Sequence, residues 1–583
     1  MLAPERVSAI ITSLTELRDV LASTRLPLVT TGAGDARAVR DALIGQIDDY
    51  LVPRLERLDA PLLAVIGGST GSGKSTLLNS LLRATVSPAG VLRPTTRAPV
   101  LACRAQELRW FEDTRVLPGL ARATGEAPAE EGALRLVVDD DVPLGLALLD
   151  APDVDSIVAD NRALATQLLA AADLWMWVTT ASRYADALPW EYLRTAKARS
   201  TALALVLNRV PPEAIEEVPR HLGEMLAAEG LPNVQVFVIA ESALDNGLLP
   251  DRALESLSAW LGALASDASA RDAVVRQTLE GALESIAGRV DAVAVAAQAQ
   301  AEAYESLAAA VRRGYGRGRV TVEETLTGGA LLRTEVLARW HELVGTGDLM
   351  RSLETRIGRL RDRLRESLLG LPSTATEVRT TLGGNVEEVV AAAADGAAER
   401  VAQDWAASPE GRELLAGNAS LERASPGLRA QTATEVRAWQ GHVLDLVRAE
   451  GAGKRAAGRA VSLGVNAVGA AVMVAVFAQT GGLTGAEVAI AGGTATVSHK
   501  LLEALFGDQA VRTLTGRARA DLMGRVERLL ADEARRFELL LETDAPDPGA
   551  PQRLRAAARA LDGAVGGSGG RRARPPDPRE RGT

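Results

Sequence analysis

The stretch that decides the fold is Gly68-Ser69-Thr70-Gly71-Ser72-Gly73-Lys74-Ser75. It follows an apolar run at 62–66 with the character of a strand, and it precedes a segment at 76–82 with the pattern of a helix. Glycines let the backbone wrap a polyphosphate with its N–H groups turned inward, and the N-terminus of the following helix adds partial positive charge. The spacing G-x-x-x-x-G-K-[ST] therefore predicts a nucleotide phosphate site.

Two side chains at the end of this stretch carry the expected chemistry. Lys74 would reach the β- and γ-phosphates, and the hydroxyl of Ser75 would ligate Mg²⁺. A carboxylate for the metal is expected at Asp150, which ends an apolar strand-like run and would hold a Mg²⁺-bound water. Between them lies a loop with two adjacent threonines, Thr95 and Thr96. A hydroxyl from this loop would complete the metal's ligands and sense the γ-phosphate.

The composition of the 583 residues limits the other classes of function. The net charge of −10 gives no electrostatic signature of nucleic-acid binding, so no nucleic-acid partner is expected. The single cysteine, Cys103, excludes an internal disulfide framework and a cysteine-rich zinc site. The first residues lack a basic segment followed by an apolar core, so we expect no signal peptide and a cytoplasmic protein.

Hydrophobic patterning predicts an α/β P-loop domain followed by a large all-α bundle or stalk. From 61 to about 250, strand-like runs alternate with helical segments, which favours a mostly parallel sheet with helices on both faces. These runs are 62–66, 134–138, 144–149, 174–179, 202–208 and 234–240. The expected regions are N-terminal helices packing on the stalk (1–60), the P-loop domain (61–250), the helical stalk (251–545), and a short helix with a disordered Gly/Pro/Arg-rich tail (546–583).

The order of three motifs resembles the GTPase domain of dynamin-like proteins, including the bacterial ones. The motifs are the Gly68–Ser75 stretch, Thr96-Arg97-Ala98-Pro99 and Asp150-Ala151-Pro152-Asp153. The resemblance implies GTP as substrate and Mg²⁺ as cofactor, with Ser75, Thr96 and Asp150 as metal ligands and Thr95 as the second choice for Thr96. It implies catalytic roles for Lys74, Thr96 and Asp150. The nucleotide-binding residues it implies are Gly68, Ser69, Thr70, Gly71, Ser72, Gly73, Lys74, Ser75, Thr76, Asp153, Asn208 and Arg209.

Three positions depart from the family pattern. Asp153 stands where the family has glycine, so its carboxylate must turn away from the phosphates or meet a cation. Asn208 and Arg209 match the start of the guanine-reading motif [NT]-K-x-D, but its aspartate is replaced by Pro211. Thr70 stands where eukaryotic dynamins have a glutamine that helps to position the attacking water. We therefore expect a preference for GTP over ATP that is smaller than in GTPases with the full motif.

A long uncharged segment lies within the predicted stalk. Residues 460–486 contain no charged side chain in 27 positions, and the longer stretch 460–498 has basic flanks, with Arg459 before it and Lys500 after it. As a helix, 460–479 would be about 30 Å long, enough to cross a hydrocarbon core. A hairpin over 460–498 would then anchor the chain in an anionic membrane. A close-packed hairpin buried inside the bundle explains the same residues.

The resemblance thus implies a dynamin-like GTPase that couples GTP hydrolysis to stalk motion and membrane association or remodelling. Its partners would be a second copy or a related GTPase across the nucleotide face, and the cytoplasmic face of a membrane through 460–498. Two alternatives stay open at this point. One is an Era-like regulatory GTPase that acts in an assembly step without a membrane role. The other is a scaffold that binds nucleotide with little hydrolysis.

Overall fold

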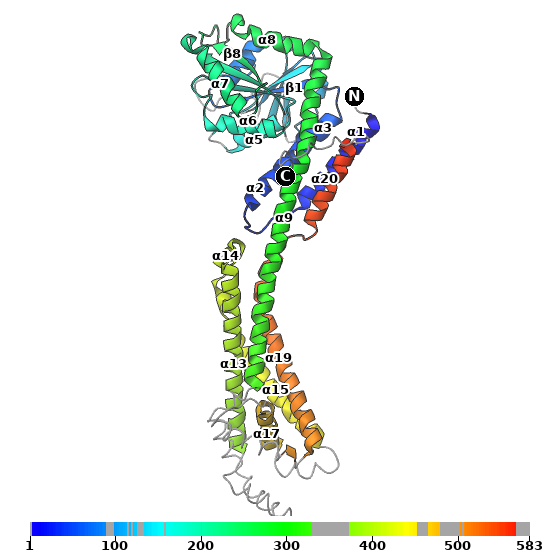
Figure 1. The fold of residues 1–583 in the computed structure, drawn as a ribbon, viewed down its shortest axis with the longest axis vertical. Helices are drawn as coiled ribbons and strands as arrows, with labels where there is room; N and C mark the ends of the chain where they lie inside the picture. Colours follow the sequence, from blue (N-terminus) through cyan, green and yellow to red (C-terminus); the bar gives the residue numbers. More distant parts are fainter. Residues whose placement is uncertain are drawn as a thin grey trace, which may run out of the picture. The chain divides into compact units, whose positions relative to one another are not determined.

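The structure is a computed structural model, and it describes residues 3–88, 98–113, 116–117, 120–124, 133–156, 159–199, 201–327, 372–451, 465–478, 502–503 and 506–566. The chain divides into two compact units. The first consists of 1–26, 32–298 and 547–583, and the second consists of 27–31 and 299–546. Figure 1 labels helices of both units and the strands β1 and β8.

The described part of the first unit contains an eight-stranded sheet with the strand order β3-β4-β2-β5-β1-β6-β7-β8. Every neighbouring pair is parallel except β2 and β5. The prediction of a mostly parallel sheet is confirmed. The strands are β1 (Leu62–Gly68), β2 (Val100–Cys103), β3 (Ala121–Thr124), β4 (Ala133–Val138), β5 (Leu146–Asp150), β6 (Leu174–Thr180), β7 (Ala202–Val210) and β8 (Gln235–Ala240).

Both faces of this sheet are covered, which explains why its central strands are continuous apolar runs. On β1, Leu63 and Val65 face one core and Leu62, Ala64 and Ile66 face the other. The first core is closed by α5 (Ala159–Ala170), α6 (Ala187–Ala198) and α7 (Glu217–Ala228). The second is closed by α4 (Lys74–Leu81), α8 (Asp251–Ser266) and the first half of α9 (Ala268–Thr327). Helices on both faces were predicted and are confirmed.

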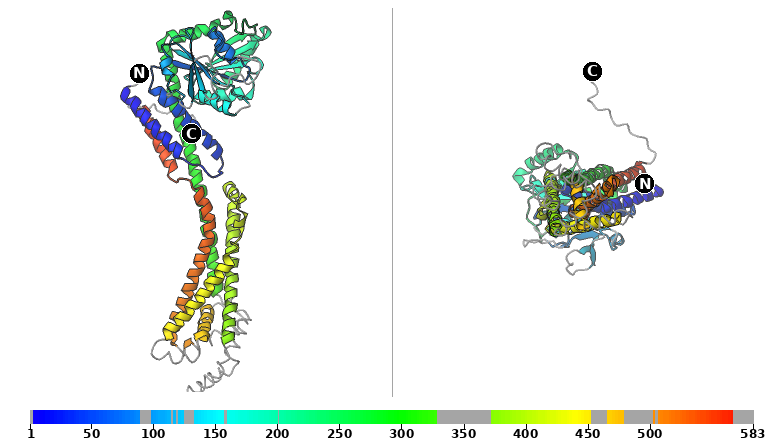
Figure 2. Two further views of the ribbon diagram at one scale, coloured as in Figure 1. Left: turned by 180° about the vertical axis from the view of Figure 1, so that it is seen from behind. Right: turned by 90° about the horizontal axis from the view of Figure 1, so that it is seen from below.

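The N-terminal helices of the described chain belong to the second of these cores. They are α1 (Pro4–Ser23), α2 (Ala33–Gln46), the π-helical turn η1 (Ile47–Leu51) and α3 (Val52–Leu55). Along α1 the buried residues Ile10, Leu14, Leu17 and Leu21 recur every three or four positions and form one apolar stripe. That stripe packs on α20 (Ala550–Gly566), and the two helices lie side by side in Figures 1 and 2.

Asp173, just before β6, joins four parts of the first unit. It is buried, and its carboxylate accepts hydrogen bonds from Leu63 N of β1 (2.9 Å) and Tyr50 Oη of η1 (3.1 Å). Its Oδ1 lies 3.1 Å from Nε of Arg54 in α3. Its backbone oxygen accepts from Thr278 Oγ1 of α9 at 3.0 Å. Burial raises the pKa of Asp173, and the charge of Arg54 with the two hydrogen bonds opposes that rise.

The second unit is a helical bundle with its own core. Its described helices are the second half of α9, α13 (Pro372–Ala406), α14 (Pro409–Ala416), α15 (Leu428–Gly451), α17 (Val465–Ala478) and α19 (Asp508–Thr543). Indole and phenyl rings fill the centre: Trp405 lies edge-on to Phe537, and Trp439 contacts Phe477.

Helix α17 is the described part of the uncharged segment, and it is a core helix here. All side chains from Val468 to Phe477 are buried, and the helix contacts α13, α15 and α19. Its 14 residues extend about 21 Å, shorter than a hydrocarbon core. Among the residues that the structure describes, no helix is both long enough and apolar enough to cross a bilayer. The buried interpretation fits α17, while 460–464 and 479–498 lie outside the described residues.

We expect Asp173→Ala to lower the free energy of unfolding of the first unit by about 3–5 kcal/mol, because it leaves the buried Arg54 without its charged partner. Guanidinium unfolding and amide exchange of β1 measure the loss. Asp272→Ala, an exposed aspartate of α9, is the matched control and should stay within about 0.5 kcal/mol. Equal stability of the two variants would show that Asp173 does not hold the unit together.

Candidate nucleotide-binding site

The P-loop follows β1 and ends where α4 begins at Lys74. Two of its glycines are required by close contacts. Gly68 has φ +150°, and a Cβ there would lie 2.2 Å from the backbone oxygen of Val178. Gly73 has φ +98°, and a Cβ there would lie 2.4 Å from Nδ2 of Asn208. Only glycine fits these positions, so the loop stays tight against β6 and β7.

Lys74 points back across the loop rather than out to solvent. Its side chain is 5% exposed, and its ammonium donates to Gly68 O at 3.0 Å and Ser69 O at 3.2 Å. It also donates to the carboxylate of Asp153. The hydroxyls of Ser69 and Ser72 are buried in the same loop and have no hydrogen-bond partner among the described residues. The loop thus gathers one cation and several donors at the N-terminus of α4.

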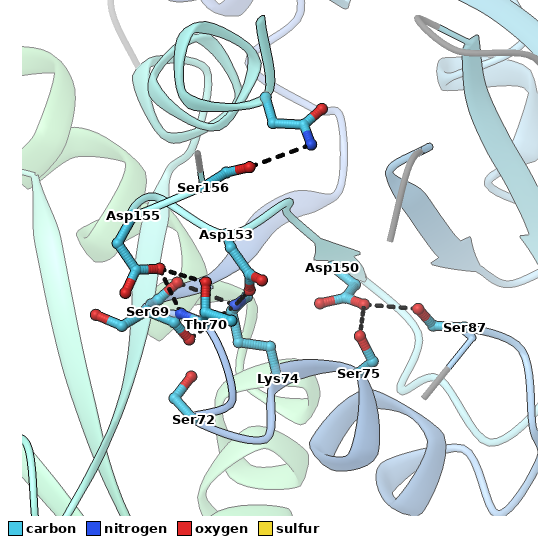
Figure 3. A network of polar contacts seen from close by, with 12 residues as sticks. Ser69, Thr70, Ser72, Lys74, Ser75, Ser87, Asp150, Asp153, Asp155 and Ser156 are labelled. Atoms are coloured by element: carbon cyan, nitrogen blue, oxygen red, sulfur yellow. Dashed lines mark hydrogen bonds and ion pairs between the residues drawn. The ribbon is translucent and has the colours of Figure 1, made fainter. Parts of the chain in front are cut away.

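Asp150 ends β5 beside the first turn of α4, and two hydroxyls converge on one of its oxygens. Ser75 Oγ and Ser87 Oγ each donate to Asp150 Oδ2 at 2.6 Å (Figure 3). The other oxygen, Oδ1, is buried without a hydrogen-bond partner in the described structure. Burial raises the pKa of Asp150, and the two hydroxyls and the charge of Lys74 act against that rise.

Mg²⁺ is the metal that a P-loop implies, and the groups at Asp150 fit it. A buried carboxylate oxygen without a partner in the described part of the chain, beside a serine hydroxyl, supplies the hard oxygen ligands that Mg²⁺ prefers. A cation here would also remove the cost of burying the charge of Asp150. Thr96 and Thr95, the expected third ligand and its alternative, lie outside the described residues.

Ser87 is a site residue that sequence reasoning missed. Asn79 of α4 holds it: Asn79 Oδ1 accepts from Ser87 N at 2.8 Å and Val86 N at 3.0 Å, and Asn79 Nδ2 donates to Ser87 O at 2.7 Å. No motif spacing marks Ser87. The sequence offers no clear signal for it, because Asn79 is one of several polar residues in α4 and its burial is visible only in the structure, where the buried amide needs partners nearby.

A second network covers the start of the P-loop. Asp155 accepts hydrogen bonds from Thr70 N at 2.5 Å and Thr70 Oγ1 at 2.6 Å. Arg183 donates to Asp155 at 3.1 Å and to Thr70 O at 3.2 Å. Burial alone would raise the pKa of Asp155, but the bonds from Thr70 and Arg183 hold it below its usual range. Asp155 and Arg183 therefore brace the loop, and neither was a candidate in the sequence.

Asn208 and Arg209 lie at the end of β7, next to the other side of the loop. Asn208 is buried and donates from Nδ2 to Ser72 O at 2.9 Å, while its Oδ1 accepts from Arg209 N at 2.9 Å. Arg209 has φ +54° and an exposed side chain. Asn208 thus braces the P-loop, and Arg209 is exposed beside it. Glu241, after β8, is tied to this edge by its backbone N–H, which donates to Val210 O at 2.8 Å.

The structure brings the expected residues Gly68–Thr76, Asp150, Asp153, Asn208 and Arg209 to one edge of the sheet, where β1, β5, β6 and β7 end. Asp153 meets the cation Lys74, which is one of the two outcomes expected for a carboxylate in place of glycine. Of the expected site residues, only Thr95 and Thr96 lie outside the residues that the structure describes.

No family model matches the chain, and no curated protein matches its sequence. Solved structures similar to it over most of its length include bacterial dynamins. One is described as an oligomerised bacterial dynamin pair with a mechanism for long-range sensing and tethering of membranes. It is 10% identical, covers 91% of this chain and 95% of its own, and has a TM-score of 0.39. Another is LeoA, a bacterial dynamin GTPase from ETEC, with 12% identity, 97% and 99% coverage, and a TM-score of 0.23.

A third similar structure is Era in complex with MgGDPNP and nucleotides of 16S ribosomal RNA. It is 19% identical, covers 34% of this chain and 56% of its own, and has a TM-score of 0.22. All three identities lie below 25% and all three TM-scores below 0.5. The function proposed below therefore rests on the residues of the site.

Ser87→Ala should raise the Mg²⁺ concentration needed for half-maximal triphosphate binding by about three- to tenfold, since one hydrogen bond that orients Asp150 is lost. Titration of nucleotide affinity against Mg²⁺ measures the change. Thr85→Ala, which removes an exposed hydroxyl two residues earlier, is the control. The same Mg²⁺ dependence in wild type and Ser87→Ala would exclude a role for Ser87 in orienting the carboxylate.

Proposed function

We propose that this chain is a dynamin-like GTPase that binds GTP with Mg²⁺ and hydrolyses it. The observation that carries the proposal is the Ser75–Asp150 pair next to Lys74: a buried carboxylate with one oxygen bonded to two hydroxyls and the other oxygen unpaired among the described residues. This pair stands at the end of a P-loop whose glycines are required by contacts. Together they supply a cradle for phosphates and ligands for a hard divalent cation.

Each residue has a defined part in this proposal. The backbone N–H groups of the P-loop and the N-terminus of α4 bind the phosphate oxygens, and Lys74 compensates charge between the β- and γ-phosphates. Ser75, Asp150 and Thr96 would hold Mg²⁺, which supplies neutralisation of the phosphate charge when bound. Asn208 keeps the loop in place through Ser72 O.

The base site supports a modest preference for guanine. Asn208 is in place and Arg209 is exposed beside it, but the aspartate that would accept from the guanine edge is absent. A site without the paired acceptor loses discrimination, because a wrong base leaves fewer polar groups unpaired. Measured affinities for GTP and ATP with Mg²⁺ test this point.

The proposal extends to self-association and membranes. A second copy or a related GTPase would dock across the nucleotide face, and 460–498 would bind an anionic membrane at its cytoplasmic side. Support for the membrane comes from the 27 uncharged positions at 460–486 and from the basic residues on both sides of 460–498. Because α17 is packed in the bundle core, membrane insertion requires α17 to leave α13, α15 and α19. An Era-like role without a membrane, or a scaffold with little hydrolysis, would be indicated by the experiments below.

Lys74→Ala should abolish measurable GTP binding and turnover at micromolar nucleotide, because the cation that compensates the phosphate charge is lost together with its charge-assisted hydrogen bonding. Isothermal titration and phosphate release measure both quantities. Lysine is rare in this chain, and Lys197→Ala on the exposed surface of α6 is the matched control that should behave as wild type. Tight binding by Lys74→Ala would refute the site, and binding without turnover in wild type would favour the scaffold.

Flotation of the full chain should be strongest on anionic liposomes and should persist in part at high salt, because apolar insertion is not screened while the basic flanks are. A cysteine pair at Gly469 and Leu444 makes the test sharper. A Cβ at 469 would lie 3.5 Å from Leu444 Cγ, the position that a cysteine sulfur would take, so a disulfide between the two positions would hold α17 against α15. Burial raises the pKa of the native Cys103 to about 12, which keeps it out of the reaction.

The oxidised pair should fail to insert, and reduction should restore insertion to the level of the wild type. Binding that is equal with and without the cross-link would show that α17 does not enter the bilayer. A wild-type chain that ignores every liposome would favour the Era-like alternative.

A further inference from the structure

The ammonium group of Lys74 has three N–H donors, and among the described residues three acceptors surround it. Two are backbone oxygens of the P-loop, Gly68 O and Ser69 O, and the third is the carboxylate of Asp153. The two backbone oxygens are part of the P-loop itself, so they stay next to Lys74 when a phosphate ligand binds. A phosphate oxygen can therefore bond to Lys74 only where Asp153 does now.

Asp153 is held in that position by its neighbours. Two residues later, Asp155 bonds to both the N–H and the hydroxyl of Thr70, and Arg183 ties Asp155 and Thr70 O together. Between them, Val154 N donates to Gly68 O at 3.4 Å. The 153–155 segment is thus fastened along the P-loop from Thr70 to Lys74, as Figure 3 shows.

The charges in this arrangement act differently on the two forms of a nucleotide. A diphosphate ends at the β-phosphate, whereas a triphosphate places a further, more highly charged group next to Lys74. Asp153 carries a negative charge at that point and is 21% exposed, so its repulsion is only partly screened by solvent. Repulsion from Asp153 therefore falls mainly on the triphosphate.

We propose that Asp153 sets the preference of the site between nucleoside diphosphate and triphosphate, by competing with the γ-phosphate for Lys74. The proposal rests on the nucleotide site proposed above and adds a specificity-determining residue to it. Triphosphate binding displaces Asp153 from Lys74, while diphosphate binding tolerates Asp153 nearby. The wild-type chain consequently holds the diphosphate with an advantage that a glycine at 153 would remove.

The test compares the affinities of the full chain for GDP and a non-hydrolysable GTP analogue, each with Mg²⁺. Asp153→Asn keeps the size of the side chain and removes its charge, and Asp153→Gly restores the residue of the family pattern. Asp140→Asn is the control: it also removes one negative charge, but it follows β4, which runs opposite to β5 and so ends at the other edge of the sheet.

We expect both Asp153 variants to bind the triphosphate about tenfold more tightly and the diphosphate within about twofold of wild type, with no change in Asp140→Asn. Diphosphate binding reports that the variant site is folded. Equal changes for both nucleotides, or weaker triphosphate binding, would overturn the role of Asp153. Failure of the proposed function would give a different result: wild type would bind neither nucleotide, or Lys74→Ala would bind both as tightly as wild type.

Discussion

The first unit depends on one buried charge pair. Asp173 and Arg54 are both nearly inaccessible to water, and the carboxylate also takes hydrogen bonds from Leu63 N and Tyr50 Oη. Such a pair adds little stability over an apolar one, but removing one partner is costly, so it fixes which segments meet. It sets α3 against the start of β1, and β1 in turn carries the P-loop. The position of the P-loop at the end of β1 therefore depends on the contact of Asp173 with Arg54 and Leu63 at the start of the same strand.

The sheet was largely predictable because its central strands are covered on both faces and read as unbroken apolar runs. β2 and β3 were missed, since each has only four residues and β3, Ala-Arg-Ala-Thr, has no buried side to mark it. Composition alone could not show whether the uncharged run containing α17 inserts in a membrane or lies in the bundle core, because both environments favour the same apolar side chains. The structure places α17 in the bundle core through contacts with residues remote in sequence, such as that of Trp439 with Phe477.

The proximity of Lys74, Ser75 and Asp150 was predictable because motif spacing places them at the carboxyl ends of neighbouring strands. Ser87, Asp155 and Arg183 were not, because each reaches the loop through a tertiary contact without a local pattern. Asp153 is intermediate between these cases. The sequence shows that Asp153 replaces the glycine of the dynamin-like pattern. Its ion pair with Lys74 depends on the position of the 153–155 segment along the loop, which no local pattern predicts.

The packing of α1 on α20 sets a condition on the order of folding. α20 begins at Ala550, more than 500 residues after α1 ends at Ser23. On a ribosome adding about 5–20 residues per second, the stripe Ile10, Leu14, Leu17 and Leu21 waits roughly 25 to 100 s for its partner helix. During that time the side of the stripe that α20 covers is an exposed apolar surface on a nascent chain, which can associate with other apolar surfaces. Until α20 is synthesised, the contacts of α1 with α2, η1 and α3 can cover only part of it.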